Sequence, residues 1–293
     1  MNIDGMHSAH LNPAPAERAM TFDCDGEHMV GILGLPAGIP YKRGVLVVVG
    51  GPQYRAGSHR QFTLLARDLA RAGIATLRFD YRGMGDSEGA ARPFDDVDAD
   101  LRAAIDAFLL AVPGVREVVL WGLCDAASAI GMYAAHDARV AGLVLLNPWV
   151  RTEDGLARAT LRHYYSARLR DRAFWRQLLR GGLDWRASLT SLVGLVRKAY
   201  RRPPAKAAAG LSLPARMRAG LHDFQGHMLV VIAGGDLTAR EFCDLADADE
   251  AWQGMLAAPR VTRQQIDEAD HTFSRRVWRD QVARWTAEWL RSW

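Results

Sequence analysis

The chain of 293 residues has few cysteines and no long apolar run. Its three cysteines, Cys24, Cys124 and Cys243, lie far apart, and no pair has the C-x-x-C spacing of a zinc ribbon or redox motif. Scattered cysteines are typical of a reducing compartment. No apolar stretch approaches the roughly 18–20 residues of a membrane span, and residues 1–20 lack the pattern of a signal peptide. We therefore expect a cytoplasmic protein without a metal or cofactor.

Charge is unevenly distributed along the chain. The net charge is +4, but residues 151–225 hold 16 Lys and Arg against five Asp and Glu. This basic and aromatic segment, with apolar residues at helical spacing over 161–182, is typical of a solvated helical lid over a pocket. A surface for anionic lipids or polyanions is the alternative. We expect no nucleic-acid partner and no stable membrane insertion, and we leave open a peripheral membrane contact through the basic lid and the oligomeric state.

Outside that segment, apolar strands alternate with amphipathic helices. Strands at 20–24 and 28–35 are predicted to form a hairpin around Asp25-Gly26. The alternation that follows predicts a mostly parallel sheet with helices on its faces. Further strands are expected at 44–49, 74–79, 115–121, 141–146, 227–233 and 260–266, and helices at 59–72, 94–111, 126–135, 241–256 and 276–292.

One α/β domain with an insertion accounts for this order better than two domains. Residues 1–150 form the first part of the core, and residues 151–225 form a helical lid or cap. Residues 226–293 supply the last strands and helix of the same sheet, because so short a segment cannot bury a core of its own.

The sequence Gly122-Leu123-Cys124-Asp125-Ala126 joins an apolar strand directly to a helix of small residues. It has the form of a nucleophile elbow, a sharp strand-to-helix turn that exposes the nucleophile. Small residues are needed at Gly122 and Ala126 because the two backbones nearly touch. The positive end of the helix dipole favours a thiolate there. We interpret Cys124 as the nucleophile; the alternative is a buried structural cysteine beside a tight turn.

An acid and a histidine follow Cys124 in the order expected for a catalytic triad. Asp236 and His271 each follow an apolar strand, where parallel sheets gather their functional residues. His271 would move the thiol proton, and Asp236 would orient the imidazole. The alternatives are a turn-forming aspartate and a surface histidine, and Asp267 and Asp270 are rival acids.

Two backbone N–H groups are needed for an oxyanion hole. One is expected from Asp125, the residue after the nucleophile. The other is expected from the loop at 50–55, where Pro52 has no N–H, so we predict Gln53, with Tyr54 in reserve. A plain Gly-Pro turn is the alternative for this loop.

A polar loop follows the strand at 74–79. Its glycines do not complete the G-x-G-x-x-G pattern of a dinucleotide site. We interpret it as scaffolding in which Asp80 and Arg82 pair with each other; Ser87 is a weak rival nucleophile.

These residues together resemble the α/β-hydrolase superfamily and, more narrowly, the first type of exosortase A system-associated hydrolase. The resemblance implies an α/β-hydrolase fold and a cytoplasmic hydrolase linked to exopolysaccharide and protein-sorting systems. Cys124 stands where serine is usual, as in dienelactone hydrolases, which resemble this chain in their Cys–His–Asp triad. The chain departs from the superfamily pattern at two further positions. Ala126 stands where glycine is usual, and Gly50 stands where many relatives have histidine. The segments that carry the resemblance are GGPQYRAGSHRQF (50–62), LRFDYRGMGDSEG (77–89), WGLCDAASA (121–129), GGDLTAREF (234–242) and DEADHTFS (267–274).

The predicted function is hydrolysis of an ester or thioester of a small-molecule acyl substrate through an acyl-Cys124 intermediate. An acyltransferase that uses the same thiol is one alternative. A non-catalytic binding protein with a basic lid is another.

Overall fold

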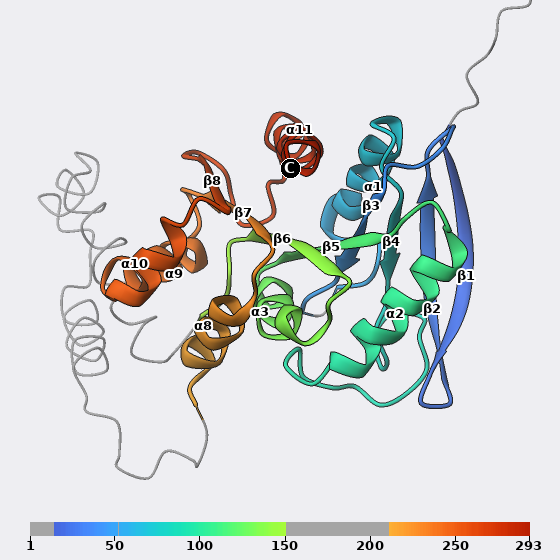
Figure 1. The fold of residues 1–293 in the computed structure, drawn as a ribbon, viewed down its shortest axis with the longest axis horizontal. Helices are drawn as coiled ribbons and strands as arrows, with labels where there is room; N and C mark the ends of the chain where they lie inside the picture. The colour runs from blue at the N-terminus through green and yellow to red at the C-terminus, as the bar shows by residue number, and fades with distance from the viewer. Residues whose placement is uncertain (1–14, 52, 151–210) are drawn as a thin grey trace, which may run out of the picture.

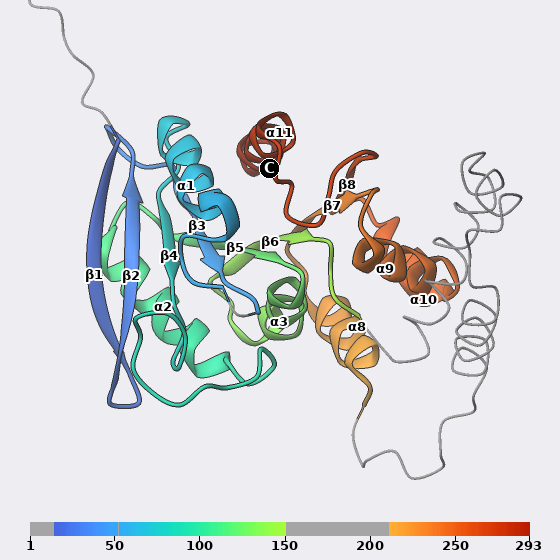
Figure 2. The same ribbon diagram turned by 180° about the vertical axis from the view of Figure 1, so that it is seen from behind.

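The computed structural model describes residues 15–51, 53–150 and 211–293. Most of the predicted lid, residues 151–210, therefore lies outside the described residues. The described part forms one sheet with helices on both faces (Figures 1 and 2).

The sheet has eight strands in the order β1-β2-β4-β3-β5-β6-β7-β8. The first two strands form the predicted antiparallel hairpin, in which Asp25 and Gly26 have φ values of 53° and 83°. β2 also pairs antiparallel with β4, and every later pairing is parallel, as predicted. The strands are β1 (Ala16–Cys24), β2 (Glu27–Leu35), β3 (Arg43–Val48), β4 (Thr76–Phe79), β5 (Glu117–Leu123), β6 (Val140–Leu146), β7 (His227–Ala233) and β8 (Val261–Ile266).

Helices cover both faces, which explains the continuous apolar runs of the central strands. One face packs against α1 and α11, and the other against α2, α3, α8, α9 and α10 (Figure 1). All six residues of β3 are buried as a result. The helices are α1 (Gln61–Arg71), α2 (Asp98–Ala111), α3 (Asp125–Tyr133), α8 (Leu213–Asp223), α9 (Leu237–Asp247), α10 (Glu250–Leu256) and α11 (Arg276–Arg291), with short 3-10 turns η1 (Ser58–Arg60) and η2 (Ala134–His136).

The prediction of a single helix at 241–256 is wrong, because the segment forms parts of two helices, α9 and α10. The Asp249 carboxylate accepts hydrogen bonds from the N–H groups of Ala251 (2.8 Å) and Trp252 (3.3 Å). This side-chain cap starts a new helix. The helix expected from residue 94 begins at Asp98, and β1 begins at Ala16 rather than at residue 20.

Helix α8 lies at the end of the segment assigned to the lid, yet it packs against α3. A Cβ atom on Gly220 of α8 would lie 2.4 Å from the carbonyl oxygen of Gly131 in α3. The glycine therefore allows the two backbones to approach closely. Met217 and Leu221 of α8 are buried in the same contact region.

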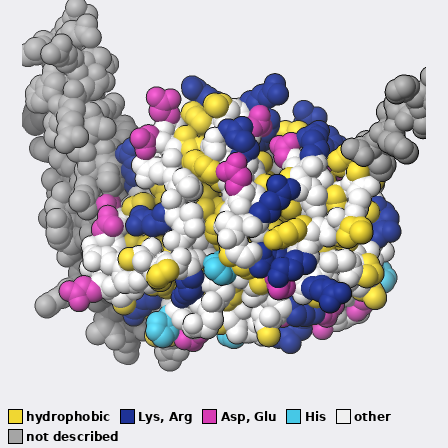
Figure 3. Space-filling model, turned by 45° about the horizontal axis from the view of Figure 1, so that its top comes forward, with side chains coloured by type: hydrophobic (Ala, Val, Ile, Leu, Met, Phe, Trp, Pro, Cys, Tyr) yellow, Lys and Arg dark blue, Asp and Glu magenta, His cyan; other side chains and the backbone are white. Residues whose placement is uncertain are grey.

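Charged side chains of both signs are interspersed on the face that Figure 3 shows. On α11, the guanidinium groups of Arg276 and Arg279 both contact Asp280. Within the described ranges, no helix is long and apolar enough to cross a bilayer.

Parallel pairing brings five segment ends to one edge of the sheet. Gly50 follows β3, Cys124 follows β5 and Asn147 follows β6. The loops after β7 and β8 carry Asp236 and His271. Ligands of open α/β sheets bind at this carboxyl edge.

Candidate active site

Cys124 occupies a strained turn between β5 and α3. Its φ and ψ are 62° and −123°, in a region that residues other than glycine rarely adopt. A Cβ atom on Gly122 would lie 2.7 Å from the backbone carbon of Ala126, so only glycine fits there. The Cys124 N–H donates to the carbonyl of Leu146 (2.9 Å) in the neighbouring strand. The sharp turn inferred from the sequence is therefore present.

Asp236 contacts His271 and also begins a helix. Its Oδ2 lies 2.7 Å from Nδ1 of His271. The same carboxylate accepts hydrogen bonds from the N–H groups of Thr238 (3.2 Å) and Ala239 (3.1 Å) at the start of α9. Asp236 is therefore both a turn residue at the start of α9 and the partner of His271. The helix cap fixes the carboxylate that orients the ring.

The rival residues are engaged elsewhere. Asp270 accepts hydrogen bonds from the backbone N–H (2.9 Å) and the hydroxyl of Ser274. Asp267 accepts from the side-chain amide of Gln265 (2.6 Å). The Ser87 hydroxyl donates to the carbonyl of Asp80 (2.6 Å) and accepts from the N–H of Val30 (2.9 Å), which ties down its loop.

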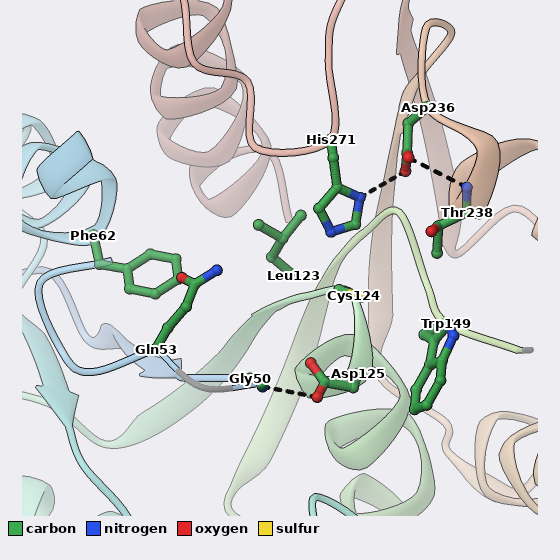
Figure 4. Close-up of a pocket in the computed structure, with 11 residues that line it drawn as sticks. Gly50, Gln53, Phe62, Leu123, Cys124, Asp125, Trp149, Asp236, Thr238 and His271 are labelled. Carbon is green, nitrogen blue, oxygen red and sulfur yellow. Dashed lines mark hydrogen bonds and ion pairs between the residues drawn. The ribbon is translucent and has the colours of Figure 1, made fainter. Parts of the chain in front are cut away.

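A cavity of about 340 Å³ gathers the predicted site residues. In Figure 4 the ring nitrogen of His271 that does not face Asp236 points toward the turn that carries Cys124. Tyr54, the reserve oxyanion donor, does not line the cavity. No group of three or more His, Cys, Asp or Glu placed to hold a metal ion occurs in residues 15–51, 53–150 and 211–293. The lining residues are Gly50, Gly51, Gln53, Phe62, Leu123, Cys124, Asp125, Trp149, Asp236, Thr238 and His271.

The surroundings of His271 favour its protonated form. The hydrogen bond to Asp236, followed by that to the Cys124 side chain, raises the pKa of His271 to about 10, although burial acts in the opposite direction. An imidazole with so high a pKa carries a proton at neutral pH.

Asn147 is a site residue that the sequence analysis missed. Its fully buried side chain donates to the carbonyl of His271 (2.9 Å) and accepts from the N–H of Ala233 (2.8 Å). It therefore links the loop that carries His271 to the end of β7, from which the Asp236 loop leaves. Its φ of 43° is a conformation that asparagine tolerates better than most residues. The available signal was a polar residue directly after the apolar strand that ends at Leu146.

Asp125 ties the elbow to the loop after β3. Its Oδ2 accepts from the N–H of Gly51 (2.8 Å), and its Oδ1 accepts from the N–H of Ala126 (3.0 Å). Burial raises the pKa of Asp125, while these N–H groups lower it. A Cβ atom on Gly50 would lie 2.0 Å from Oδ1, so the glycine makes room for the carboxylate.

A second contact holds the far end of the same loop. The buried Asp80 carboxylate accepts from the N–H of Arg55 (2.6 Å) and pairs with its guanidinium group. The predicted pairing of Asp80 with Arg82 is therefore wrong. Arg82 instead contacts the buried carboxylate of Asp100 (3.0 Å), because its side chain extends toward α2.

Comparisons with known proteins point to one family and one fold. A model of the alpha/beta hydrolase family matches residues 45–285. The esterase Pf2001 of Pyrococcus furiosus has a similar structure, with a TM-score of 0.64, 14% identity, and coverage of 95% of this chain and 93% of that one. Est1E of Butyrivibrio proteoclasticus, solved with ferulic acid, has a TM-score of 0.58, 17% identity, and coverage of 93% and 99%.

A third similar structure is XC6422 of Xanthomonas campestris, described as an α/β serine hydrolase without a lid. Its TM-score is 0.55 at 18% identity, with coverage of 96% of this chain and 100% of that one. A search of curated protein sequences found no match. Identities this low show the fold alone. The predicted α/β-hydrolase fold is confirmed, and the resemblance to exosortase-associated hydrolases stays a prediction.

Proposed function

The chain belongs to the alpha/beta hydrolase family, and we propose that it hydrolyses an ester or thioester through the triad Cys124, His271 and Asp236. One observation carries this proposal. A cysteine held in a strained turn shares a cavity with a histidine whose Nδ1 lies 2.7 Å from a carboxylate. This is the arrangement of nucleophile, base and orienting acid in acyl transfer.

The proposed reaction begins with a thiolate at Cys124 and an imidazolium at His271. The thiolate sulfur attacks the carbonyl carbon, and a carbon–sulfur bond forms. The carbon–oxygen or carbon–sulfur bond to the leaving group then breaks, and His271 donates its proton to the departing atom. The neutral imidazole next takes a proton from water while the water oxygen attacks the acyl carbon. The carbon–sulfur bond to Cys124 breaks, and the acid product leaves.

The cavity walls favour an apolar acyl group next to the nucleophile. Phe62 and Leu123 are nearly fully buried, and the N–H of Trp149 donates to the carbonyl of Cys124 (3.2 Å), which holds Trp149 beside the turn. The similarity to the esterase Pf2001 supports ester hydrolysis as the class of reaction. The resemblance of the ordered motifs supports a cytoplasmic role beside exopolysaccharide or exosortase systems.

Steady-state hydrolysis of p-nitrophenyl esters and matching thioesters, over a series of acyl chain lengths, tests this function. We expect saturable turnover by the wild type and a loss of at least about 10³-fold in Cys124→Ala. Cys243→Ala is the matched control, because Cys243 lies on α9 and does not line the cavity. Equal rates for wild type and Cys124→Ala would contradict the proposal.

A further inference from the structure

The side chain of Asp125 lines the catalytic cavity but takes no part in the proposed triad. Its two carboxylate oxygens accept from the backbone N–H groups of Gly51 (2.8 Å) and Ala126 (3.0 Å), which are uncharged donors. Figure 4 shows the carboxylate turned toward the loop after β3. A carboxylate oxygen can accept more than one hydrogen bond, so both oxygens keep acceptor capacity toward the cavity.

The charged side chains that line the cavity carry an excess of negative charge. Among the described residues they are Asp125, Asp236 and His271, and no Lys or Arg is present. The imidazole of His271 is bonded to Asp236 at 2.7 Å, so its positive charge is already matched by one carboxylate. Burial raises the pKa of Asp125, which reflects the cost of a carboxylate removed from water. A cation in the cavity would offset that cost.

Aromatic rings lie in the same cavity wall. Trp149 and Phe62 both line the cavity. The half-buried Trp149 is fixed in place, because its backbone N–H donates to the carbonyl of Cys124 (3.2 Å) and its ring packs edge-on against Phe94, with ring centroids 5.2 Å apart. The faces of aromatic rings attract cations, and indole attracts them most strongly. A carboxylate and an indole together suit an ammonium group, and they oppose an anion.

We infer that the cavity selects esters or thioesters that carry an ammonium group near the scissile carbonyl and discriminates against those that carry a carboxylate there. This inference rests on the proposed function and names its substrate class. The ammonium group contacts the carboxylate of Asp125 and the ring of Trp149. Attraction between charges is stronger in a cavity than in bulk water. Gly50 leaves room for the carboxylate, because a Cβ atom there would lie 2.0 Å from Oδ1.

Pairs of substrates that differ in charge but not in shape test the inference. On the acyl side, p-nitrophenyl γ-trimethylammoniobutyrate is compared with its uncharged carbon isostere and with p-nitrophenyl hydrogen adipate, which is anionic. On the leaving-group side, butyrylthiocholine is compared with its own carbon isostere. Each kcat/KM is divided by the rate of uncatalysed hydrolysis. We expect the cationic member of at least one pair to be preferred about 10-fold, and the adipate to be the poorest substrate.

Asp125→Asn should reduce that preference to near 1, because asparagine keeps an oxygen for the Gly51 N–H but carries no charge. Since the preference is a ratio, any common loss of activity in the variant cancels. Trp149→Leu should reduce it about 3-fold. Asp98→Asn is the matched control. Asp98 is the first residue of α2, as Asp125 is of α3, but it is exposed and does not line the cavity.

The outcomes separate the inference from the proposed function. A preference in one pair alone supports the inference and assigns the ammonium group to that side of the carbonyl. If the wild type hydrolyses the neutral isosteres and shows no preference in either pair, the inference is overturned while the proposed function stands. A preference that Asp125→Asn and Asp98→Asn both leave intact also overturns it. If the wild type hydrolyses none of these compounds and forms no acyl-Cys124, both fall.

Discussion

The two walls of the cavity differ in how their polar groups are satisfied. On the wall formed by the loops after β7 and β8, Asp236 is bonded to His271 and to the start of α9. Asn147 fixes the backbone behind both loops. On the opposite wall, the loop after β3 has its Gly51 N–H occupied by Asp125 and leaves the Gln53 oxygen without a partner in the described ranges.

This difference separates two tasks. The wall with His271 has its polar groups paired without substrate, and the contact with Asp236 raises the pKa of His271 to about 10. The wall with Gln53 keeps one buried acceptor, the Gln53 Oε1, without a partner among the described residues. Changes on the first wall should therefore alter pKa values and reactivity toward alkylating agents. Changes on the second should lower activity while the pKa of His271 stays near 10.

The largest effect is expected for His271→Ala. Loss of the proton carrier should lower kcat/KM for ester hydrolysis by at least about 10³-fold. His222→Ala is the matched control, because His222 also lies 3.0 Å from a neighbouring carboxylate, that of Asp223, but is exposed on α8. If both variants lose activity equally, or neither does, the histidine wall is not the acid–base half of the site.

Asp236→Asn should lower activity about 10²- to 10⁴-fold, because asparagine does not hold the imidazolium and its ring position as a carboxylate does. Asparagine is a good N-cap, so α9 should remain intact. The largest cause of the raised His271 pKa would be removed, and that pKa should fall from about 10 toward its ordinary value of 6.5. NMR titration of the His271 ring measures this. An unchanged pKa would show that Asp236 does not set the charge.

Asn147→Gly and Asn147→Ala should destabilise the fold by about 1–3 kcal/mol, because the buried N–H of Ala233 loses its acceptor. Glycine tolerates the positive φ, so the difference between the two variants isolates backbone strain. Activity should also fall, by up to about 10²-fold, as the loop that carries His271 shifts. Urea denaturation and ester hydrolysis provide the two measurements. If both variants were as stable as the wild type, the Asn147 side chain would not stabilise the fold as described.

Gly50→Ala should act on the other wall. Its Cβ would lie 2.0 Å from Oδ1 of Asp125 and 2.9 Å from the backbone nitrogen of Ala126, so the loop must shift. We expect kcat to fall about 10-fold or more, while the His271 pKa stays near 10. A large change in that pKa would mean that the two walls are not separate.

The smallest effect concerns stability against pH. The folded-state pKa of His271 is raised above 6.5, so its contribution is complete below about pH 6.5 and is lost as the pH rises through about 10. The difference in unfolding free energy between wild type and Asp236→Asn should therefore shrink over that window. Denaturant melts at pH 6, 8 and 10 measure it. If the difference in unfolding free energy instead grew with pH, the protonated form of His271 would not be the one that stabilises the fold.

The sequence predicted the first wall better than the second. Cys124 and Asp236 each follow an apolar strand, His271 follows the more polar strand β8, and parallel pairing necessarily brings residues after such strands to one edge. The contacts that support them are long-range: Asn147 reaches the His271 loop, and Asp125 reaches Gly51. Their partners depend on packing and not on spacing. For the same reason, the packing of α8 on α3 could not be read from the composition of its segment.

The central claim is that Cys124 carries the acyl group. The most direct measurement is peptide mapping by mass spectrometry after acid quenching of a brief reaction with p-nitrophenyl acetate. We expect one acetyl group on Cys124 and none on Cys24 or Cys243, since burial raises the pKa of Cys24 to about 11 and raises that of Cys243 as well. Asp236→Asn should form the adduct more slowly. No acetyl on Cys124, or equal labelling of all three cysteines, would contradict the account.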